Sequence, residues 1–179
     1  MPDMPTLVQR EADLSLRAAQ DFVRPRVIWP PDPQDGSPIA IFLWDREAGF
    51  EEVADALSRE GGFIVLALNT IAPDLAAIAV EWVADHGELL GGDPDRLVVA
   101  GGGLAATVAL QARDEGWPPI RRQLLIGPDV VGWPPAEEPL TGAPPATIVN
   151  ARGYAGRLRD AGVEVQELLP GEPMTFDWL

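Results

Sequence analysis

The chain has 179 residues, no cysteine, and a formal net charge of −15 from 28 acidic and 13 basic residues. This length suits one domain, and the lack of cysteine excludes disulfide bonds and thiolate chemistry. The negative charge argues against nucleic-acid binding, which needs a cationic surface. No apolar run reaches the length of a membrane span, and the first residues lack the pattern of a signal peptide. We therefore expect a cytoplasmic protein without a membrane or nucleic-acid partner.

The N-terminal stretch carries apolar side chains at helical spacing. This pattern over residues 6–23 predicts an amphipathic helix that ends near Pro25. We therefore expect residues 1–24 to form an N-terminal helical segment. Residues 25–179 are expected to form an α/β domain.

Short apolar runs alternate with amphipathic stretches over the rest of the chain, which is typical of α/β proteins. Strands are expected at 26–29, 39–44, 63–68, 97–100, 121–126, 146–150 and 163–169. Helices are expected at 50–57, 73–86, 104–115 and 154–161. The pattern predicts a three-layer sandwich, with a mostly parallel sheet of about seven strands and helices on both faces.

Three consecutive glycines form the turn around which this pattern is organised. The apolar run 97–100 leads into Gly101, Gly102 and Gly103, and an alanine-rich helix follows. A turn of this kind at the carboxyl edge of a parallel sheet is where α/β folds place their chemistry. The turn itself contains no nucleophile.

Residues 90–106 read LGGDPDRLVVAGGGLAA, which resembles the elbow region of hormone-sensitive-lipase-type esterases in the α/β-hydrolase superfamily. Those proteins read GGDPDR, a strand, and then G-D-S-A-G-G-x-L-A-A, with serine at the centre of the G-x-S-x-G elbow. The resemblance covers about Ile39 to Leu169 and implies the α/β-hydrolase fold and carboxylic-ester hydrolysis. Here either the block with the serine is absent or Gly103 stands in its place. Neither alignment supplies a nucleophile.

Other positions that the resemblance would assign to catalysis also differ from the family pattern. Residues 44–47 read WDRE where the family has the oxyanion-hole glycines H-G-G-G, and an anionic side chain there opposes a developing oxyanion. The turn that carries the family's aspartate is absent after Asn150. Met174 stands where the family has its histidine, and only residues 129–145 remain of the second cap segment. We therefore expect a truncated, catalytically degenerate member with a reduced cap.

The remaining polar residues do not suggest another catalytic centre. His86 is the single histidine, and we interpret it as a solvated residue that interacts favourably with a helix dipole. One histidine without cysteines argues against a transition-metal site, and no cofactor is expected. The serines are Ser15, Ser37 and Ser58, and none of them follows a predicted strand as an elbow requires.

The first functional hypothesis is a non-catalytic homologue that acts as a binding or interaction partner. The partner would be an intact hydrolase, a pathway enzyme or a second copy, because members of the resembled family pair through their last strand and adjoining helices. Phe176 and Trp178 are candidate contacts if they are exposed. The alternative is that they pack back over the helix that contains Leu158.

The second hypothesis is a small-molecule binder, or a non-hydrolytic enzyme, that uses a vestigial cleft. Its expected lining is Trp44, Asp45, Gly101, Gly102, Gly103, Trp133 and Met174. Asp45 would be its acid/base group, and backbone N–H groups of the glycines could accept an anion. The net charge disfavours phosphorylated ligands, so a small hydrophobic ligand is expected. Residual carboxylesterase activity, and a chain without selected function, remain further alternatives.

Overall fold

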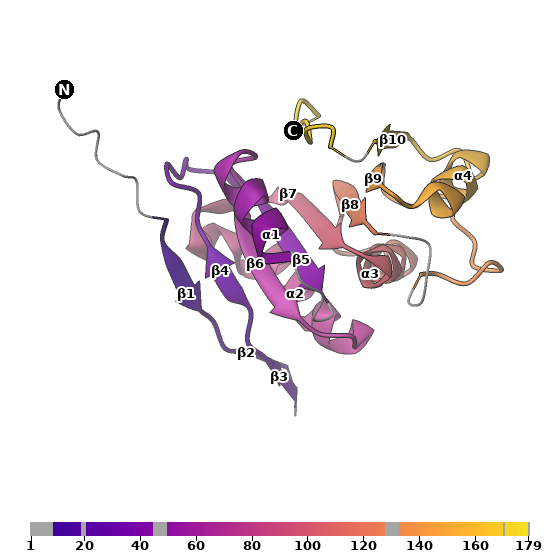
Figure 1. Cartoon of the computed structure of the whole chain (residues 1–179). Coiled ribbons are helices and arrows are strands. Elements are labelled where there is room, and N and C mark those ends of the chain that lie inside the picture. The colour runs from indigo at the N-terminus through magenta and orange to yellow at the C-terminus, as the bar shows by residue number, and fades with distance from the viewer. Residues whose placement is uncertain (1–8, 19–20, 45–49, 128–132, 170, 179) are drawn as a thin grey trace, which may run out of the picture.

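The computed structural model describes residues 9–18, 21–44, 50–127, 133–169 and 171–178. Its centre is an eight-stranded sheet of order β1-β4-β6-β5-β7-β8-β9-β10 (Figure 1). The strands are β1 (Glu11–Asp13), β4 (Arg26–Ile28), β5 (Ser37–Trp44), β6 (Ile64–Asn69), β7 (Gly92–Gly101), β8 (Arg122–Ile126), β9 (Ala146–Val149) and β10 (Val165–Leu168). The sheet therefore has one strand more than the sequence predicts.

The sheet is parallel from β6 to β10, and only β1 and β4 run antiparallel to their neighbours. β5 lies at the centre, where Ile41 is paired with Leu66 of β6 and with Val99 of β7. The run 37–43 is buried throughout, as expected for a strand that is covered on both faces. The prediction of a mostly parallel sheet is confirmed.

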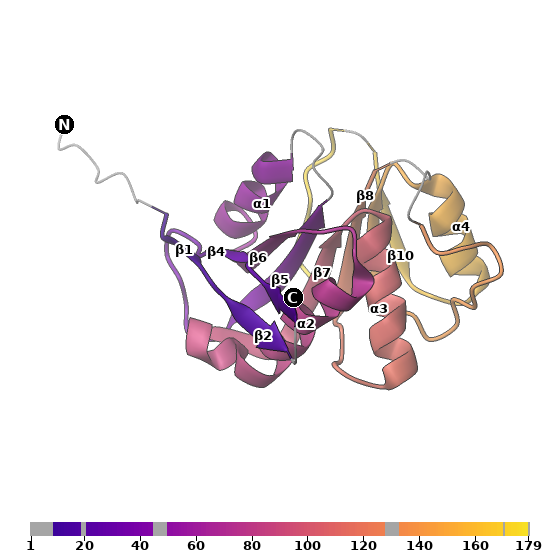
Figure 2. The ribbon, with the colours of Figure 1, turned by 90° about the horizontal axis from the view of Figure 1, so that it is seen from below.

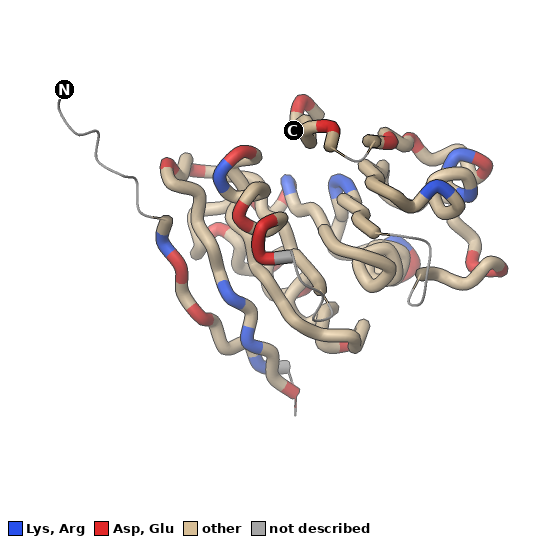
Figure 3. Tube along the Cα trace, viewed as in Figure 1, with Lys and Arg blue, Asp and Glu red and all other residues tan. Residues whose placement is uncertain are grey.

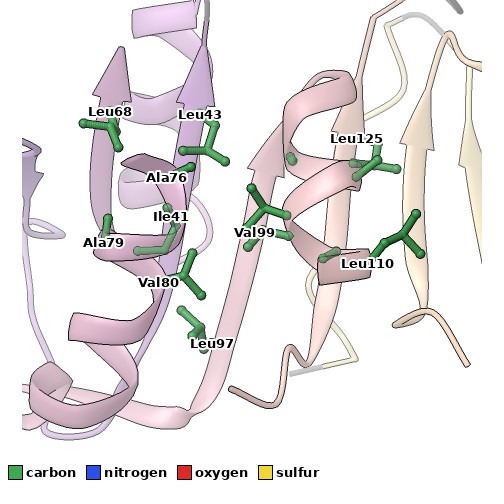
Figure 4. Close-up of a cluster of buried hydrophobic side chains, with 14 of the residues drawn as sticks. Ile41, Leu43, Leu68, Ala76, Ala79, Val80, Leu97, Val99, Leu110 and Leu125 are labelled. Carbon is green, nitrogen blue, oxygen red and sulfur yellow. The ribbon is translucent and has the colours of Figure 1, made fainter. Parts of the chain in front are cut away.

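Helices cover both faces of this sheet (Figures 1 and 2). They are α1 (Phe50–Arg59), α2 (Pro73–His86), the short 3-10 helix η1 (Gly87–Leu90), α3 (Gly103–Glu115) and α4 (Arg152–Asp160). Successive residues of a strand point to opposite faces, so Ile41 and Leu43 pack in one apolar cluster with α2 and α3 (Figure 4). Phe42 points the other way, into a second cluster with Ala54 and Leu57 of α1.

The prediction of an N-terminal helix is wrong for the described residues of this segment. They form β1 and a two-stranded hairpin of β2 (Leu16–Ala18) and β3 (Asp21–Val23). Leu16 and Val23 are buried in the cluster that α2 contributes to, so tertiary packing has overridden the helical spacing. Because β1 pairs with β4, the sheet continues across the boundary that we expected at residue 24.

Residues 171–178 cover part of the α1 face of the sheet. Met174, Phe176 and Trp178 are half-buried against the cluster that contains Phe63. The Phe63 ring centroid lies 5.4 Å from that of Phe176 and 6.3 Å from that of Trp178. Leu158 belongs to the cluster on the opposite face. The two aromatic residues are therefore neither fully exposed nor packed over Leu158.

Candidate functional site

The glycine turn joins the end of β7 to the start of α3. Gly101 is the last residue of β7, with a φ of 138°, and a Cβ atom built there would lie 2.1 Å from the carbonyl oxygen of Leu43. Only glycine fits such a close approach at this dihedral angle. Gly102 has a φ of −92°, and among the described residues a Cβ atom there would meet only the carbonyl oxygen of Ile126, at 3.6 Å. The turn thus retains room for a side chain at Gly102.

The first turn of α3 begins without a side-chain cap. The carbonyl oxygen of Gly102 accepts hydrogen bonds from the N–H groups of Ala105 at 3.0 Å and Ala106 at 3.4 Å. The N–H groups of Gly103 and Leu104 precede these bonds, as in any helix N-terminus. The geometry is therefore that of a strand, a tight turn and a helix, with glycine where an elbow would carry its nucleophile.

The residues expected to line a vestigial cleft are divided between the two faces of the sheet. Trp44, the last residue of β5, is half-buried and belongs with Met174 to the α1-face cluster. Trp133 packs on the opposite cluster, 5.0 Å from the ring of Tyr154. Asp45 lies outside the described residues. The structure thus brings Trp44 and Met174 to one face of the sheet and Trp133 to the other face. The glycines lie at the carboxyl end of β7.

Neither the position that the resemblance assigns to the base nor the residue after which the family's aspartate turn is missing carries a titratable group. Met174 presents a thioether, which does not take up a proton at ordinary pH. Asn150 follows β9 with a φ of 62° and is exposed, and its amide cannot replace a carboxylate as a base. Asparagine is one of the few residues that tolerate this left-handed conformation.

His86 lies at the far end of α2 from the glycine turn. This helix begins after the carboxyl end of β6 and finishes before β7 starts. The exposed imidazole stacks on Trp82 with a centroid distance of 5.3 Å, and its Nδ1 lies 3.2 Å from the Trp82 carbonyl oxygen. The prediction of a solvated histidine at a helix end is confirmed.

The three serines also lie away from the glycine turn. The Ser37 hydroxyl, at the start of β5, donates to the carbonyl oxygen of Gln34 at 2.7 Å. Ser58 is fully buried in α1, and Ser15 is exposed between β1 and β2. Within the described part of the chain, no cluster of acidic and histidine side chains could hold a metal ion. Over the same residues, no helix is long and apolar enough to cross a membrane.

The sequence did not predict a row of polar side chains that crosses β8, β9 and β10 on the α1 face. The Arg122 guanidinium donates to the Thr147 hydroxyl at 3.4 Å, which donates to the Gln166 amide oxygen at 3.3 Å. The Gln166 amide nitrogen then donates to the Thr175 hydroxyl at 3.2 Å. The one local signal is an arginine at the start of an apolar strand, and its partners lie far along the chain.

Comparisons with known proteins agree with this architecture. A family model described as the α/β-hydrolase fold matches residues 70–147. Esterase LipI of Mycobacterium tuberculosis is 31% identical over 186 residues, which cover 92% of this chain and 58% of LipI. Carboxylesterase NlhH of the same species is 34% identical over 122 residues, which cover 58% of this chain and 38% of NlhH.

Solved structures share the fold at lower identity. An esterase from Pseudomonas putida superposes with a TM-score of 0.75 at 21% identity, covering 90% of this chain and 72% of that one. An esterase from Pyrobaculum calidifontis gives a TM-score of 0.76 at 21% identity, covering 89% and 75% respectively. These likenesses concern the fold alone.

The strand order, the two antiparallel strands at one end and the turn between β7 and α3 define an α/β-hydrolase fold. The chain has the α/β-hydrolase fold, and its sequence is similar to those of two esterases of Mycobacterium tuberculosis. It spans 58% of LipI and 38% of NlhH.

Proposed function

We propose that the chain is a non-catalytic α/β-hydrolase homologue that acts as a binding or protein-interaction partner. The observation that carries the proposal is which residues form the β7–α3 turn. Gly102 has room for a side chain, yet the turn consists of Gly101, Gly102 and Gly103 and offers no nucleophile. Met174 stands at the position of the family's base, and serine hydrolysis needs nucleophile and base within hydrogen-bond reach of each other.

The outer edge of β10 supports an interaction role. The N–H group of Ala146 donates to the carbonyl oxygen of Glu164 at 2.9 Å, so residues 164, 166 and 168 direct their backbone groups toward β9. The backbone groups of Val165 and Glu167 then point away from the sheet. An edge strand of this kind can pair with a strand of another chain. The partner would be a second copy, an intact hydrolase or a pathway enzyme.

The pairing proposal is tested with two substitutions at one position. Glu167→Pro removes an outward N–H group, whereas Glu167→Ala retains it, and both remove the ion pairs of Glu167 with Arg152 and Arg159. Native mass spectrometry of the gently purified chain is expected to detect a stoichiometric second chain in the wild type and in E167A. E167P is expected to be a folded monomer. A wild-type monomer without a partner, or a pairing that survives E167P, would contradict the use of this edge.

The similarity to esterases also supports a second candidate, residual carboxylesterase activity, because the relatives LipI and NlhH are named as esterases. This activity would require one of the three serines to serve as a nucleophile. A fluorophosphonate ester that reacts with activated serines distinguishes the two candidates by intact mass. An unmodified chain supports the non-catalytic proposal, and one stoichiometric adduct supports the esterase.

A vestigial-cleft binder is a third candidate, which rests on Trp44, Met174 and the glycine edge. A small hydrophobic ligand that co-purifies with an unpartnered chain in the same native spectra would favour it. Asp45→Asn is then expected to weaken retention of that ligand, and unchanged retention would remove Asp45 from the site.

A further inference from the structure

A hollow lies at the end of the sheet where the parallel strands begin, opposite the end that carries the glycine turn. It has a volume of about 520 Å³, within the range of small-molecule sites. Arg121 and Arg122 line it where β8 begins. Pro145, just before β9, and Glu164, just before β10, line it as well. Figure 3 shows the basic stretch at the start of β8. Trp178 brings residues 171–178 to the same hollow.

The two adjoining arginines differ in what they already bind. The Arg122 side chain is 7% exposed and donates to the Glu164 carboxylate at 2.6 Å. Its guanidinium also lies 4.8 Å from the ring centroid of Trp178. Arg121 is exposed, and its guanidinium makes no hydrogen bond or ion pair with any described residue. Arg121 is thus a cation that a ligand can bind, whereas Arg122 holds Glu164 and Trp178 together in the wall of the hollow.

Part of the wall around Arg121 is apolar, beside the polar side chains that also line the hollow. Ile120, Pro145 and Trp178 are all half-buried and line the hollow. The indole N–H of Trp178 is already used, since it donates to the carbonyl oxygen of Thr175 at 3.0 Å. The indole therefore offers a ring surface rather than a donor, and planar apolar groups stack well on such a surface.

We propose that this hollow binds a small aromatic carboxylate. The Arg121 guanidinium takes the carboxylate in a charge-assisted, two-point hydrogen bond, and the aromatic body lies against Trp178 and Pro145. Asp95 and Glu164 line the same hollow, and their charges oppose ligands with several negative groups. The site thus accepts one carboxylate on a flat apolar body. It is independent of the β10 edge and of the glycine turn.

Benzoate and its neutral isostere benzamide test this proposal on the full chain. Binding is followed by NMR through the Trp178 indole N–H signal, which is identified by its loss in Trp178→Phe. Benzoate is expected to shift this signal and to bind about tenfold more tightly than benzamide, because only benzoate forms a charged hydrogen bond with Arg121.

Arg121→Gln is expected to weaken benzoate about tenfold and to leave benzamide unchanged. Arg17→Gln is the matched control, because Arg17 is also an exposed arginine but lies on the hairpin strand β2. Equal affinity for the two compounds, undiminished benzoate binding in R121Q, or equal weakening in R17Q would overturn the proposal. An unshifted Trp178 signal at saturating benzoate would overturn it as well.

Discussion

The carbonyl oxygen of Leu43 lies too close to Gly101 for any other residue to place its Cβ atom at position 101. The separation from an ideal Cβ on Gly101 is 2.1 Å, and the φ of Gly101 is 138°. The carboxyl ends of β5 and β7 therefore approach as closely as glycine allows. This contact fixes the turn from which α3 starts.

Gly101→Ala is expected to destabilise the fold by about 3 kcal/mol or more, since it adds a steric clash to a strained dihedral angle. Gly102→Ala is the matched control, because within the described part of the chain its Cβ would meet only the Ile126 carbonyl oxygen, at 3.6 Å. Its expected cost is about 1 kcal/mol or less. Urea denaturation of both variants measures the difference, and equal stabilities would contradict the close contact.

Gly102→Ser places a hydroxyl at the turn without a clash, yet it is not expected to create an esterase. A serine needs a base to take its proton, and Met174 at the family's base position cannot do so. Hydrolysis of a p-nitrophenyl ester by G102S should therefore equal that of the wild-type chain. A saturable gain of activity in this single variant would show that a base is present near the turn.

Phe176 and Trp178 are expected to contribute to folding stability through their contacts with Phe63. Because both side chains are half-buried, replacing either with alanine should cost about 2 kcal/mol, less than for a fully buried aromatic residue. Phe22→Ala is the control, since Phe22 is 56% exposed, and should cost less than about 1 kcal/mol. Thermal unfolding checks that Phe176→Ala and Trp178→Ala lower stability more than Phe22→Ala does. If residues 171–178 were detached from the sheet, Phe22→Ala would lower it more.

Tyr154 makes stability depend on alkaline pH. Burial raises the pKa of Tyr154 to about 12, although the charges of Arg157 and Arg113 act in the opposite direction. The folded state holds the phenol proton more tightly than the unfolded state, so this contribution is complete below about pH 10 and is lost as the pH rises toward about 12. The loss is expected to be on the order of 2 kcal/mol.

Tyr154→Phe provides the test, because it should remove this part of the alkaline decline in unfolding free energy. Tyr154 is the single tyrosine of the chain, so tyrosinate absorbance reports its titration directly. A titration near pH 10 in the folded protein would contradict the shift.

The strands and helices of the core could be predicted because their signals are local. The apolar run 39–44 indicates a buried strand, and the glycines at 101–103 mark the turn before α3. The hairpin over 16–23 could not be predicted in this way, since Leu16 and Val23 are fixed by contact with α2 rather than by their own spacing. Helical periodicity in a short segment is a weak signal against such packing.

At the candidate sites, the sequence predicts the glycine turn and the lack of the family's catalytic side chains, because both can be recognised from the residue types alone. Arg122 and Trp178 are in contact but lie far apart in the sequence, so no local sequence pattern predicts this contact. The same holds for the division of Trp44 and Trp133 between the two faces. Which face a side chain occupies follows from strand register, and register comes from pairing across the whole sheet.

The proposed function predicts that the chain performs no ester hydrolysis. The most direct test is the rate of p-nitrophenyl butyrate hydrolysis by the purified wild-type chain, compared with buffer and with an equal concentration of an unrelated acidic protein. The absence of a nucleophile at the β7–α3 turn predicts a rate equal to these controls and linear in substrate concentration. Saturable turnover that co-elutes with the chain through successive columns would contradict the claim.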